Sequence, residues 1–157
     1  SEFEEQPECM PDRYESGTPN TIGIAGLGAG VSFVLEQTVE AVRAREEELA
    51  SRFLAGLQDL RDEVILYGPQ DASRQTAVVS FNIKNVTSSD AADYFEEQRG
   101  ILCRPGLHCA PSAHRTIGTF PRGTVRFSFG FFNTQQEVDD ACEALRELVK
   151  RKGKPGS

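Results

Sequence analysis

Two stretches of the sequence alternate apolar and polar side chains with a period of two, and they constrain the fold more than any other feature. In residues 124–129, Val125, Phe127 and Phe129 share one face, which leaves Arg126 and Ser128 on the other. Residues 76–83 alternate in the same way, with one set of side chains wholly apolar: Ala77, Val79, Phe81 and Ile83. Such strands are typical of antiparallel sheets that are covered on one face. The pattern therefore predicts a half-covered sheet, with Arg126 pointing away from its core.

Helical spacing surrounds these two strands. It predicts helices over residues 21–37 and 39–60, a helix capped by Ser88 or Ser89 that runs to about residue 98, and a final helix opened by the capping box Thr134-Gln-Gln-Glu137. Short apolar runs predict two more strands at 64–67 and 101–104, and Pro105-Gly106 should end the second. This order of elements predicts an α+β fold, a small, mainly antiparallel sheet of about four strands covered by helices.

The chain of 157 residues is long enough for one domain with its own core. We expect an irregular segment over residues 1–20, a single α+β domain over 21–150, and a tail over 151–157. Glycines in the first predicted helix indicate close packing against another surface: Gly23, Gly26, Gly28 and Gly30. They do not match a dinucleotide-binding loop, which needs a preceding strand and G-x-G-x-x-G spacing.

The net charge of −7, with basic residues scattered, argues against a nucleic-acid partner, because phosphate binding needs a concentrated cationic face. No apolar run approaches membrane-spanning length and no signal peptide is visible, so we expect a cytoplasmic protein without a membrane partner. The four cysteines do not resemble a secreted disulfide framework.

The segment 100–114 gathers both histidines and two of the four cysteines on Gly- and Pro-rich backbone. Cys109 lies beside His108 and close to Arg104, and nearby cations favour the nucleophilic thiolate. A disulfide between Cys103 and Cys109 is an alternative. A zinc site that adds His114 is another, but no C-x-x-C pair exists, so we predict no metal. Outside this segment, Cys142 falls at helical spacing and should be a small buried side chain, and Cys9 is expected to be incidental.

Three further motifs follow one another along the chain: Arg13-Tyr-Glu-Ser-Gly-Thr-Pro-Asn20, Arg104-Pro-Gly-Leu-His-Cys-Ala110, and Val125-Arg-Phe-Ser128 with Asn133-Thr134. In this order they resemble the C-terminal part of cysteine desulfurases, members of the class V aminotransferase family of fold-type I pyridoxal-phosphate enzymes. The resemblance covers essentially the whole chain. It implies the fold of the C-terminal domain of these transferases, a pyridoxal 5′-phosphate cofactor, a homodimer, and conversion of cysteine to alanine with the sulfur passed to an enzyme cysteine as a persulfide.

The resemblance also implies roles for individual residues. Cys109 resembles the persulfide-forming nucleophile, and Arg126 resembles the arginine that grips the substrate carboxylate. Arg104 and His108 would shape the thiolate site, and Gly17-Thr18 resembles the turn that approaches the cofactor phosphate of the partner subunit. Each residue also has a plain structural alternative: a buried thiol for Cys109, a surface ion pair for Arg126, a core imidazole for His108, and a turn for residues 17–19.

Two departures from the family pattern matter. Leu107-His108-Cys109 stands where the group with a structured cysteine loop has His-His-Cys, which leaves the substrate and the sulfur acceptor open. None of the four lysines falls in a plausible Schiff-base site: Lys84, Lys150, Lys152 and Lys154. We therefore expect a C-terminal domain that lacks its N-terminal large domain and is inactive alone.

Three other functions stay open at this stage. The first is a stand-alone binding or interaction domain of the same fold without catalysis. The second is a related lyase, such as a selenocysteine lyase. The third is a thiol redox protein that uses Cys103 and Cys109.

Overall fold

The computed structural model describes residues 5, 7–15 and 17–152, and its chain separates into two compact units, Ser1–Val39 and Glu40–Ser157. The boundary falls just after Val39, the first residue of the second helix. The domain bounds expected from the sequence, 1–20, 21–150 and 151–157, stay a prediction, and most of the expected tail lies outside the described residues.

The first unit contains one helix, α1 (Thr21–Gln37), with the bounds that the sequence predicts. Asn20 caps it, because its Oδ1 accepts a hydrogen bond of 3.0 Å from the backbone N–H of Gly23. No residue of α1 is buried, and apolar side chains such as Ile22 and Leu27 are exposed. The packing expected for the glycine-rich face therefore stays a prediction.

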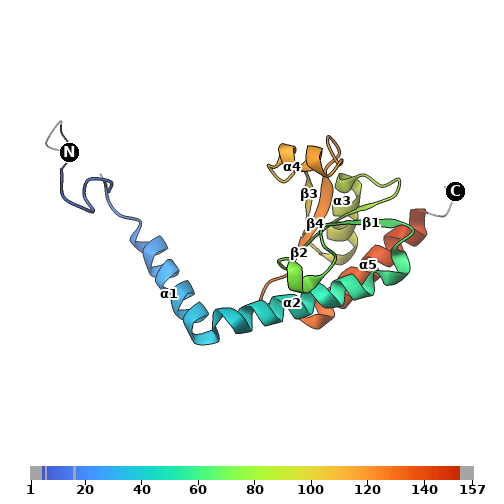
Figure 1. The fold of residues 1–157 in the computed structure, drawn as a ribbon, viewed down its shortest axis with the longest axis horizontal. Coiled ribbons are helices and arrows are strands. Elements are labelled where there is room, and N and C mark those ends of the chain that lie inside the picture. The colour runs from blue at the N-terminus through green and yellow to red at the C-terminus, as the bar shows by residue number, and fades with distance from the viewer. Residues whose placement is uncertain (1–4, 6, 16, 153–157) are drawn as a thin grey trace. The chain divides into compact units, whose positions relative to one another are not determined.

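The second unit is built on a four-stranded sheet in the order β1-β2-β4-β3, with every neighbouring pair antiparallel (Figure 1). The strands are β1 (Val64–Tyr67), β2 (Val78–Ile83), β3 (Arg104–Gly106) and β4 (Thr124–Ser128). This confirms the α+β class and the small antiparallel sheet. The last strand of the chain lies inside the sheet, and β3 forms one edge.

The core lies between the apolar face of this sheet and three helices, α2 (Val39–Gly56), α3 (Ser88–Arg99) and α5 (Gln135–Lys152). Phe53 of α2 is its centre: its ring centroid lies 6.2 Å from that of Phe81, 5.4 Å from that of Phe127 and 5.1 Å from that of Phe129. Burying aromatic rings in tilted contact gives a large hydrophobic gain together with specific geometry. The alternate residues predicted for the core face of β2 are indeed buried.

Capping explains where the helices begin and end. Thr134 and Glu137 form the predicted capping box, with the Thr134 N–H donating to Glu137 Oε2 at 2.7 Å and the Glu137 N–H donating to Thr134 Oγ1 at 3.1 Å. The predicted cap of α3 is wrong by one residue, because Thr87 Oγ1 accepts from the Asp90 N–H. The predicted helix 39–60 ends at Gly56, and a short 3₁₀ turn, η1 (Gln58–Leu60), follows. A second 3₁₀ turn, η2 (Ala72–Arg74), lies between β1 and β2.

The strand predicted at 101–104 is wrong in its bounds. Gly100 has a φ of +63° and its N–H bonds to Glu96, while the N–H of Ile101 bonds to Phe95, so the start of the apolar run closes α3. The observed strand β3 instead includes Pro105, the residue at which the sequence pattern ends it. Proline is tolerated there because β3 pairs only with β4 and is an edge strand.

One helix was not predicted, the six-residue α4 (Pro111–Thr116), which starts on proline. Among the residues that the structure describes, no single helix is long and apolar enough to cross a membrane. Helices α1 and α2 reach the length and apolar composition of a membrane-spanning segment only when they are taken together, and the helix is interrupted between them.

Candidate thiol and guanidinium site

The register of the sheet places Arg104 of β3 directly opposite Arg126 of β4, with Ser80 of β2 on the other side of Arg126. Directly opposed residues project from the same face of a sheet. Because Val125 and Phe127 are buried in the core, this row lies on the other face, as predicted for Arg126. We call it the polar row, and Tyr67 of β1, which pairs with Ser80, completes it.

The two arginines of the polar row are not neutralised by acids in the described part of the chain. The ion pairs found there involve other arginines, and Arg126 Nε is buried with no hydrogen-bond partner. Like charges directly opposite each other repel, and an unsatisfied buried donor is costly. A carboxylate that accepts hydrogen bonds from these guanidinium groups would relieve both costs. The surface ion pair considered for Arg126 is therefore not what the described residues form.

Cys109 is exposed and contacts Arg104, one of these two arginines. Arg104 Nη2 donates a hydrogen bond of 3.2 Å to Cys109 Sγ. A charged donor at this distance stabilises negative charge on sulfur, and the thiolate is the reactive form. The alternative of a buried, inert thiol does not describe Cys109.

The backbone that carries Cys109 is a tight turn from Leu107 to Ala110, which we call the thiol turn. The N–H of Ala110 donates to the Leu107 carbonyl at 2.8 Å, and the two central residues have positive φ, +52° at His108 and +59° at Cys109. Turns with two such residues favour Asn-Gly, because a β-carbon is crowded in this conformation. The thiol turn therefore needs contacts from outside to hold it.

His108 supplies one such contact. Its Nε2 lies 2.9 Å from the Arg104 carbonyl oxygen, which can only accept, so Nε2 carries the proton and Nδ1 keeps a lone pair. Partial burial lowers the pKa of His108 and outweighs the hydrogen bond to the Arg104 carbonyl, which raises it; the charges of Arg126, His114 and Arg104 lower it further. His108 is therefore a neutral imidazole at neutral pH. It is half-buried rather than part of the core.

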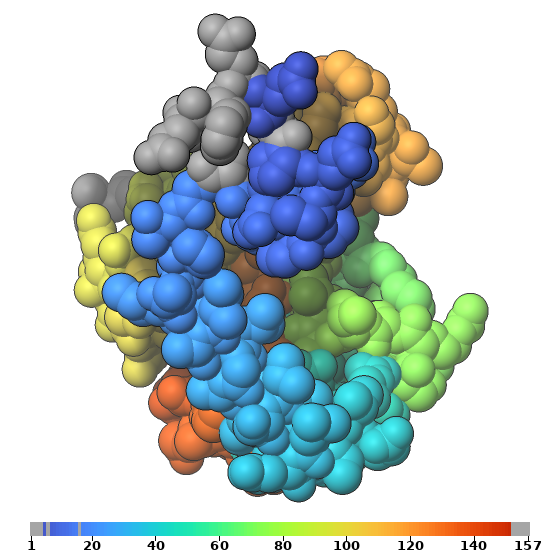
Figure 2. All heavy atoms as spheres, turned by 90° about the vertical axis from the view of Figure 1, so that its left-hand side faces the viewer, coloured from blue at the N-terminus to red at the C-terminus, as the bar shows by residue number. Residues whose placement is uncertain are grey.

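His114 is the buried histidine of this region, only 4% exposed. Its Nδ1 lies 2.6 Å from Thr119 Oγ1, and its ring centroid lies 5.4 Å from that of His108. All other residues of α4 are exposed, and this segment, coloured orange, lies at the surface in Figure 2. Sequence reasoning considered His114 only as a zinc ligand. In the described ranges, no three His, Cys, Asp or Glu side chains come together in a way that could hold a metal.

Two of the other cysteines, Cys103 and Cys142, are not poised as nucleophiles. Burial raises the pKa of Cys103 to about 11, with a further contribution from Glu96, so this thiol stays protonated at neutral pH. Cys142 is 3% exposed and burial raises its pKa to about 11 as well, which confirms the prediction of a small buried side chain. Cys103 and Cys109 are both free thiols.

The residues expected to serve a cofactor fall into both units of the chain. Gly17 and Thr18 are exposed residues of the first unit, and their contact with a phosphate stays a prediction. Lys84 and Lys150 are exposed on the second unit, and a Schiff-base lysine must instead be desolvated or held near cations. Neither lysine fits that role, and the side chain of Lys152 and the whole of Lys154 lie outside the described residues.

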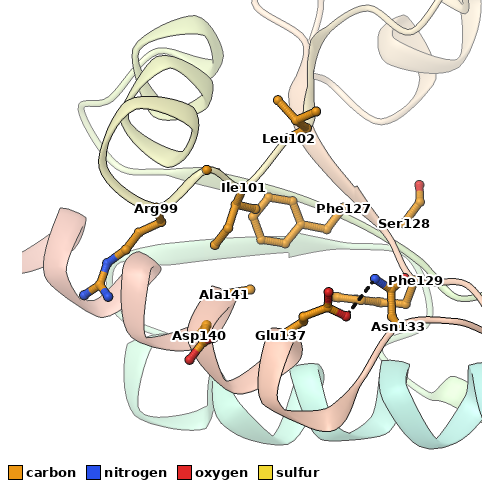
Figure 3. Close-up of a pocket in the computed structure, with 11 residues that line it drawn as sticks. Arg99, Ile101, Leu102, Phe127, Ser128, Phe129, Asn133, Glu137, Asp140 and Ala141 are labelled. Atoms are coloured by element: carbon orange, nitrogen blue, oxygen red, sulfur yellow. Dashed lines mark hydrogen bonds between the residues drawn. The ribbon is translucent and has the colours of Figure 1, made fainter.

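A separate pocket of about 410 Å³ lies between the end of α3, the end of β4 and the start of α5 (Figure 3). Its apolar part includes Ile101, Phe127 and Phe129. Glu137 on its rim accepts from Asn133 Nδ2 at 3.2 Å and is already engaged in the capping box. None of the residues predicted for catalysis or substrate binding lines this pocket.

Residues 2–140 match the family described as aminotransferase class-V. A probable cysteine desulfurase from Pyrococcus abyssi is 36% identical over 140 residues, which are 89% of this chain and 34% of that protein. A cysteine desulfurase from Haloferax volcanii is 35% identical over 144 residues, 90% of this chain and 33% of that protein. The apo structure of a cysteine desulfurase from Thermococcus onnurineus superposes with a TM-score of 0.82 at 35% identity, over 90% of this chain and 34% of that one. The chain thus spans about one third of the length of these relatives.

Proposed function

The chain belongs to the class V aminotransferase family, and on this premise we propose that it is the C-terminal, substrate-side domain of a pyridoxal-phosphate-dependent cysteine desulfurase. The similar proteins named as cysteine desulfurases are about three times as long, so an N-terminal large domain would supply the remainder. We propose that the complete enzyme is a homodimer. It would convert L-cysteine to L-alanine and keep the sulfur on Cys109 as a persulfide, for transfer to an acceptor protein.

In this proposal Cys109 is the nucleophile. Its thiolate forms a bond to the sulfur of the substrate, the bond between that sulfur and the substrate β-carbon breaks, and the β-carbon gains a proton to become the methyl group of alanine. The net change is from a thiol and cysteine to a persulfide and alanine, so no external oxidant is needed. The hydrogen bond of 3.2 Å from Arg104 supports the anionic form of the attacking sulfur.

The polar row holds the substrate in the same proposal. Arg126 grips the substrate carboxylate, because its buried Nε has no partner of its own, and a planar guanidinium can bind a carboxylate through two parallel hydrogen bonds. Arg104 adds positive charge directly opposite Arg126. His108, neutral with its lone pair on Nδ1, can accept a proton within the site.

Pyridoxal phosphate supplies the electron withdrawal that the reaction requires. The exposed Lys84 and Lys150 do not fit as its covalent attachment, so we assign that attachment to the large domain. Gly17 and Thr18 are proposed to approach its phosphate from the partner subunit.

The observation that carries the proposal is that Arg104 is next to both Arg126 and Cys109. It lies opposite Arg126 in the sheet and also donates to Cys109 Sγ, so the carboxylate clamp and the thiol meet at one side chain. A carboxylate clamp and a nucleophilic thiol together are what an enzyme needs to hold an amino acid and take its sulfur.

The test uses the complete enzyme that carries this sequence, incubated with pyridoxal phosphate and L-cysteine. We expect alanine and a persulfide on Cys109, detected by mass spectrometry of the peptide that contains it. Cys109→Ala should abolish the persulfide, whereas Cys9→Ala should leave it unchanged. Absence of alanine from the complete enzyme, or no effect of Cys109→Ala, would refute the desulfurase assignment, and selenocysteine in place of cysteine tests the related lyase.

A second candidate, a stand-alone binding domain of the same fold, is favoured by the exposed lysines, which leave no covalent anchor for the cofactor in the described residues. The two candidates differ in the coding sequence upstream of Ser1. An open frame that encodes a lysine in a strand-helix context supports the enzyme domain, and a start codon at this boundary supports the independent domain.

A further inference from the structure

His114 is held from its backbone as well as from its ring. Its carbonyl oxygen accepts from the N–H of Thr119 at 2.8 Å and from the N–H of Phe120 at 3.1 Å. Its Nδ1 lies 2.6 Å from the Thr119 hydroxyl, and Thr119 is itself 7% exposed. The Thr119 carbonyl in turn accepts from Gly123, next to the start of β4. The orientation of the imidazole is therefore fixed relative to β4, one of the two inner strands of the sheet.

The ring of His114 is in contact with the ring of His108, with centroids 5.4 Å apart and planes inclined by 59°. His108 is tied on its other side to the Arg104 carbonyl through Nε2. A continuous series of contacts thus runs from Thr119 through His114 and His108 to Arg104, the residue that donates to Cys109.

This series of contacts ends at the thiol turn, whose backbone conformation is strained. Both central residues of the thiol turn have positive φ without being glycine, and such conformations persist only where the surroundings impose them. The Leu107–Ala110 hydrogen bond closes the turn but does not fix its direction relative to the sheet. The His108 ring, clamped between the Arg104 carbonyl and His114, does so.

We propose that His114, oriented by Thr119, is a positioning residue that holds the thiol turn so that Cys109 Sγ stays within reach of the Arg104 guanidinium. His114 does not touch the sulfur in this arrangement and acts through His108. The functional meaning of the inference rests on the proposed function of Cys109 as sulfur acceptor, but the geometry can be tested without the desulfurase reaction.

The experiment measures the rate at which iodoacetamide alkylates Cys109 in the 157-residue chain, resolved by peptide mass spectrometry, with the exposed Cys9 as internal reference. Thr119→Val removes the hydroxyl at nearly constant shape, and Thr119→Ser keeps it. We expect Thr119→Val to slow alkylation of Cys109 by about threefold to tenfold, the range for loss of one hydrogen bond, and Thr119→Ser to restore the wild-type rate. His114→Phe keeps an aromatic ring but loses Nδ1, and it should reproduce the Thr119→Val result.

A control is needed to show that a general loss of stability does not by itself slow the alkylation of Cys109. Val138→Ala, at a buried position of α5, serves as the matched control, and we expect it to lower the thermal midpoint without changing the Cys109 rate. All rates are taken at a temperature where circular dichroism shows every variant folded. Equal rates for Thr119→Val and Thr119→Ser, or a slow rate in Val138→Ala, would overturn the positioning role.

The outcome is separable from that of the proposed function. If the complete enzyme forms no persulfide while Thr119→Val still slows alkylation and Thr119→Ser does not, the desulfurase assignment fails and the positioning role of His114 stands. If the persulfide forms but the two Thr119 variants behave alike, the reverse holds.

Discussion

At Cys109, strained backbone and thiol chemistry occur at the same residue. The sequence was sufficient to select Cys109, Arg104 and His108, because reactive residue types are clustered on Gly- and Pro-rich backbone, and the structure joins these three by hydrogen bonds. Thr119 could not be found in this way. It meets His114 across the end of a short helix, and no periodic pattern links two residues on either side of such an end.

Replacing Arg104 tests the link between guanidinium and sulfur. Arg104→Gln removes the charge that stabilises the thiolate, so we expect alkylation of Cys109 at about pH 7.5 to slow by about threefold to tenfold. Arg115→Gln is the matched control, since the Arg115 guanidinium lies over the Phe120 ring at 4.4 Å. The rate is measured by peptide-resolved iodoacetamide labelling. An equal effect of both substitutions would mean that general surface charge, and not the contact with Arg104, governs the thiol.

At the level of elements, β3 and the start of β4 approach so closely that no β-carbon fits between them at Gly123. A β-carbon on Gly123 would overlap the carbonyl group of Gly106, and both glycines have positive φ. The sequence predicted both strands from their residue patterns. It could not predict the bounds of β3. Proline usually ends a strand, and it is compatible with β3 only because β3 lies at the edge of the sheet, which the sequence does not reveal.

Gly123→Ala should therefore be far more harmful than an alanine at another glycine with positive φ. Gly118 has a φ of +76° and nothing within 4 Å of an added β-carbon, so Gly118→Ala carries only the conformational cost of about 1–2 kcal/mol. Gly123→Ala adds a backbone clash, and we expect the free energy of unfolding to fall by about 3 kcal/mol or more. Urea denaturation at neutral pH measures both. Similar losses in the two variants would contradict the close approach of β3 and β4.

For the whole molecule, the sequence was enough for the fold class and for which faces of the strands are buried, because period-two and helical patterns report burial directly. The order of the strands and the division after Val39 were beyond it, since both depend on contacts between distant segments. The resemblance in ordered motifs carried the family assignment, which the match over residues 2–140 confirms.

Because the thiol of Cys142 is buried, we expect the free energy of unfolding of the second unit to fall as the pH is raised into the alkaline range. Its pKa is raised from 9.0 to about 11 in the folded state, so the unfolded chain loses this proton first as the pH rises. The contribution is fully present below about pH 9 and is lost between about pH 9 and 11, by about 2–3 kcal/mol. Urea unfolding of wild type and Cys142→Ala across this range measures it, and ionisation of tyrosines cancels in the difference. Parallel curves for the two proteins would disprove the prediction.

The position of β4 has a consequence for the order in which the molecule assembles. This strand is the last in the chain, yet it pairs with both β2 and β3 and so completes the sheet from the inside. Contacts between distant segments form late in folding because they close long loops. Arg126 meets Arg104 only once β4 has paired with β3, so the site depends on that pairing. Until then β2 and β3 expose unpaired edges, and a chain that stalls at this point is vulnerable to pairing with another copy.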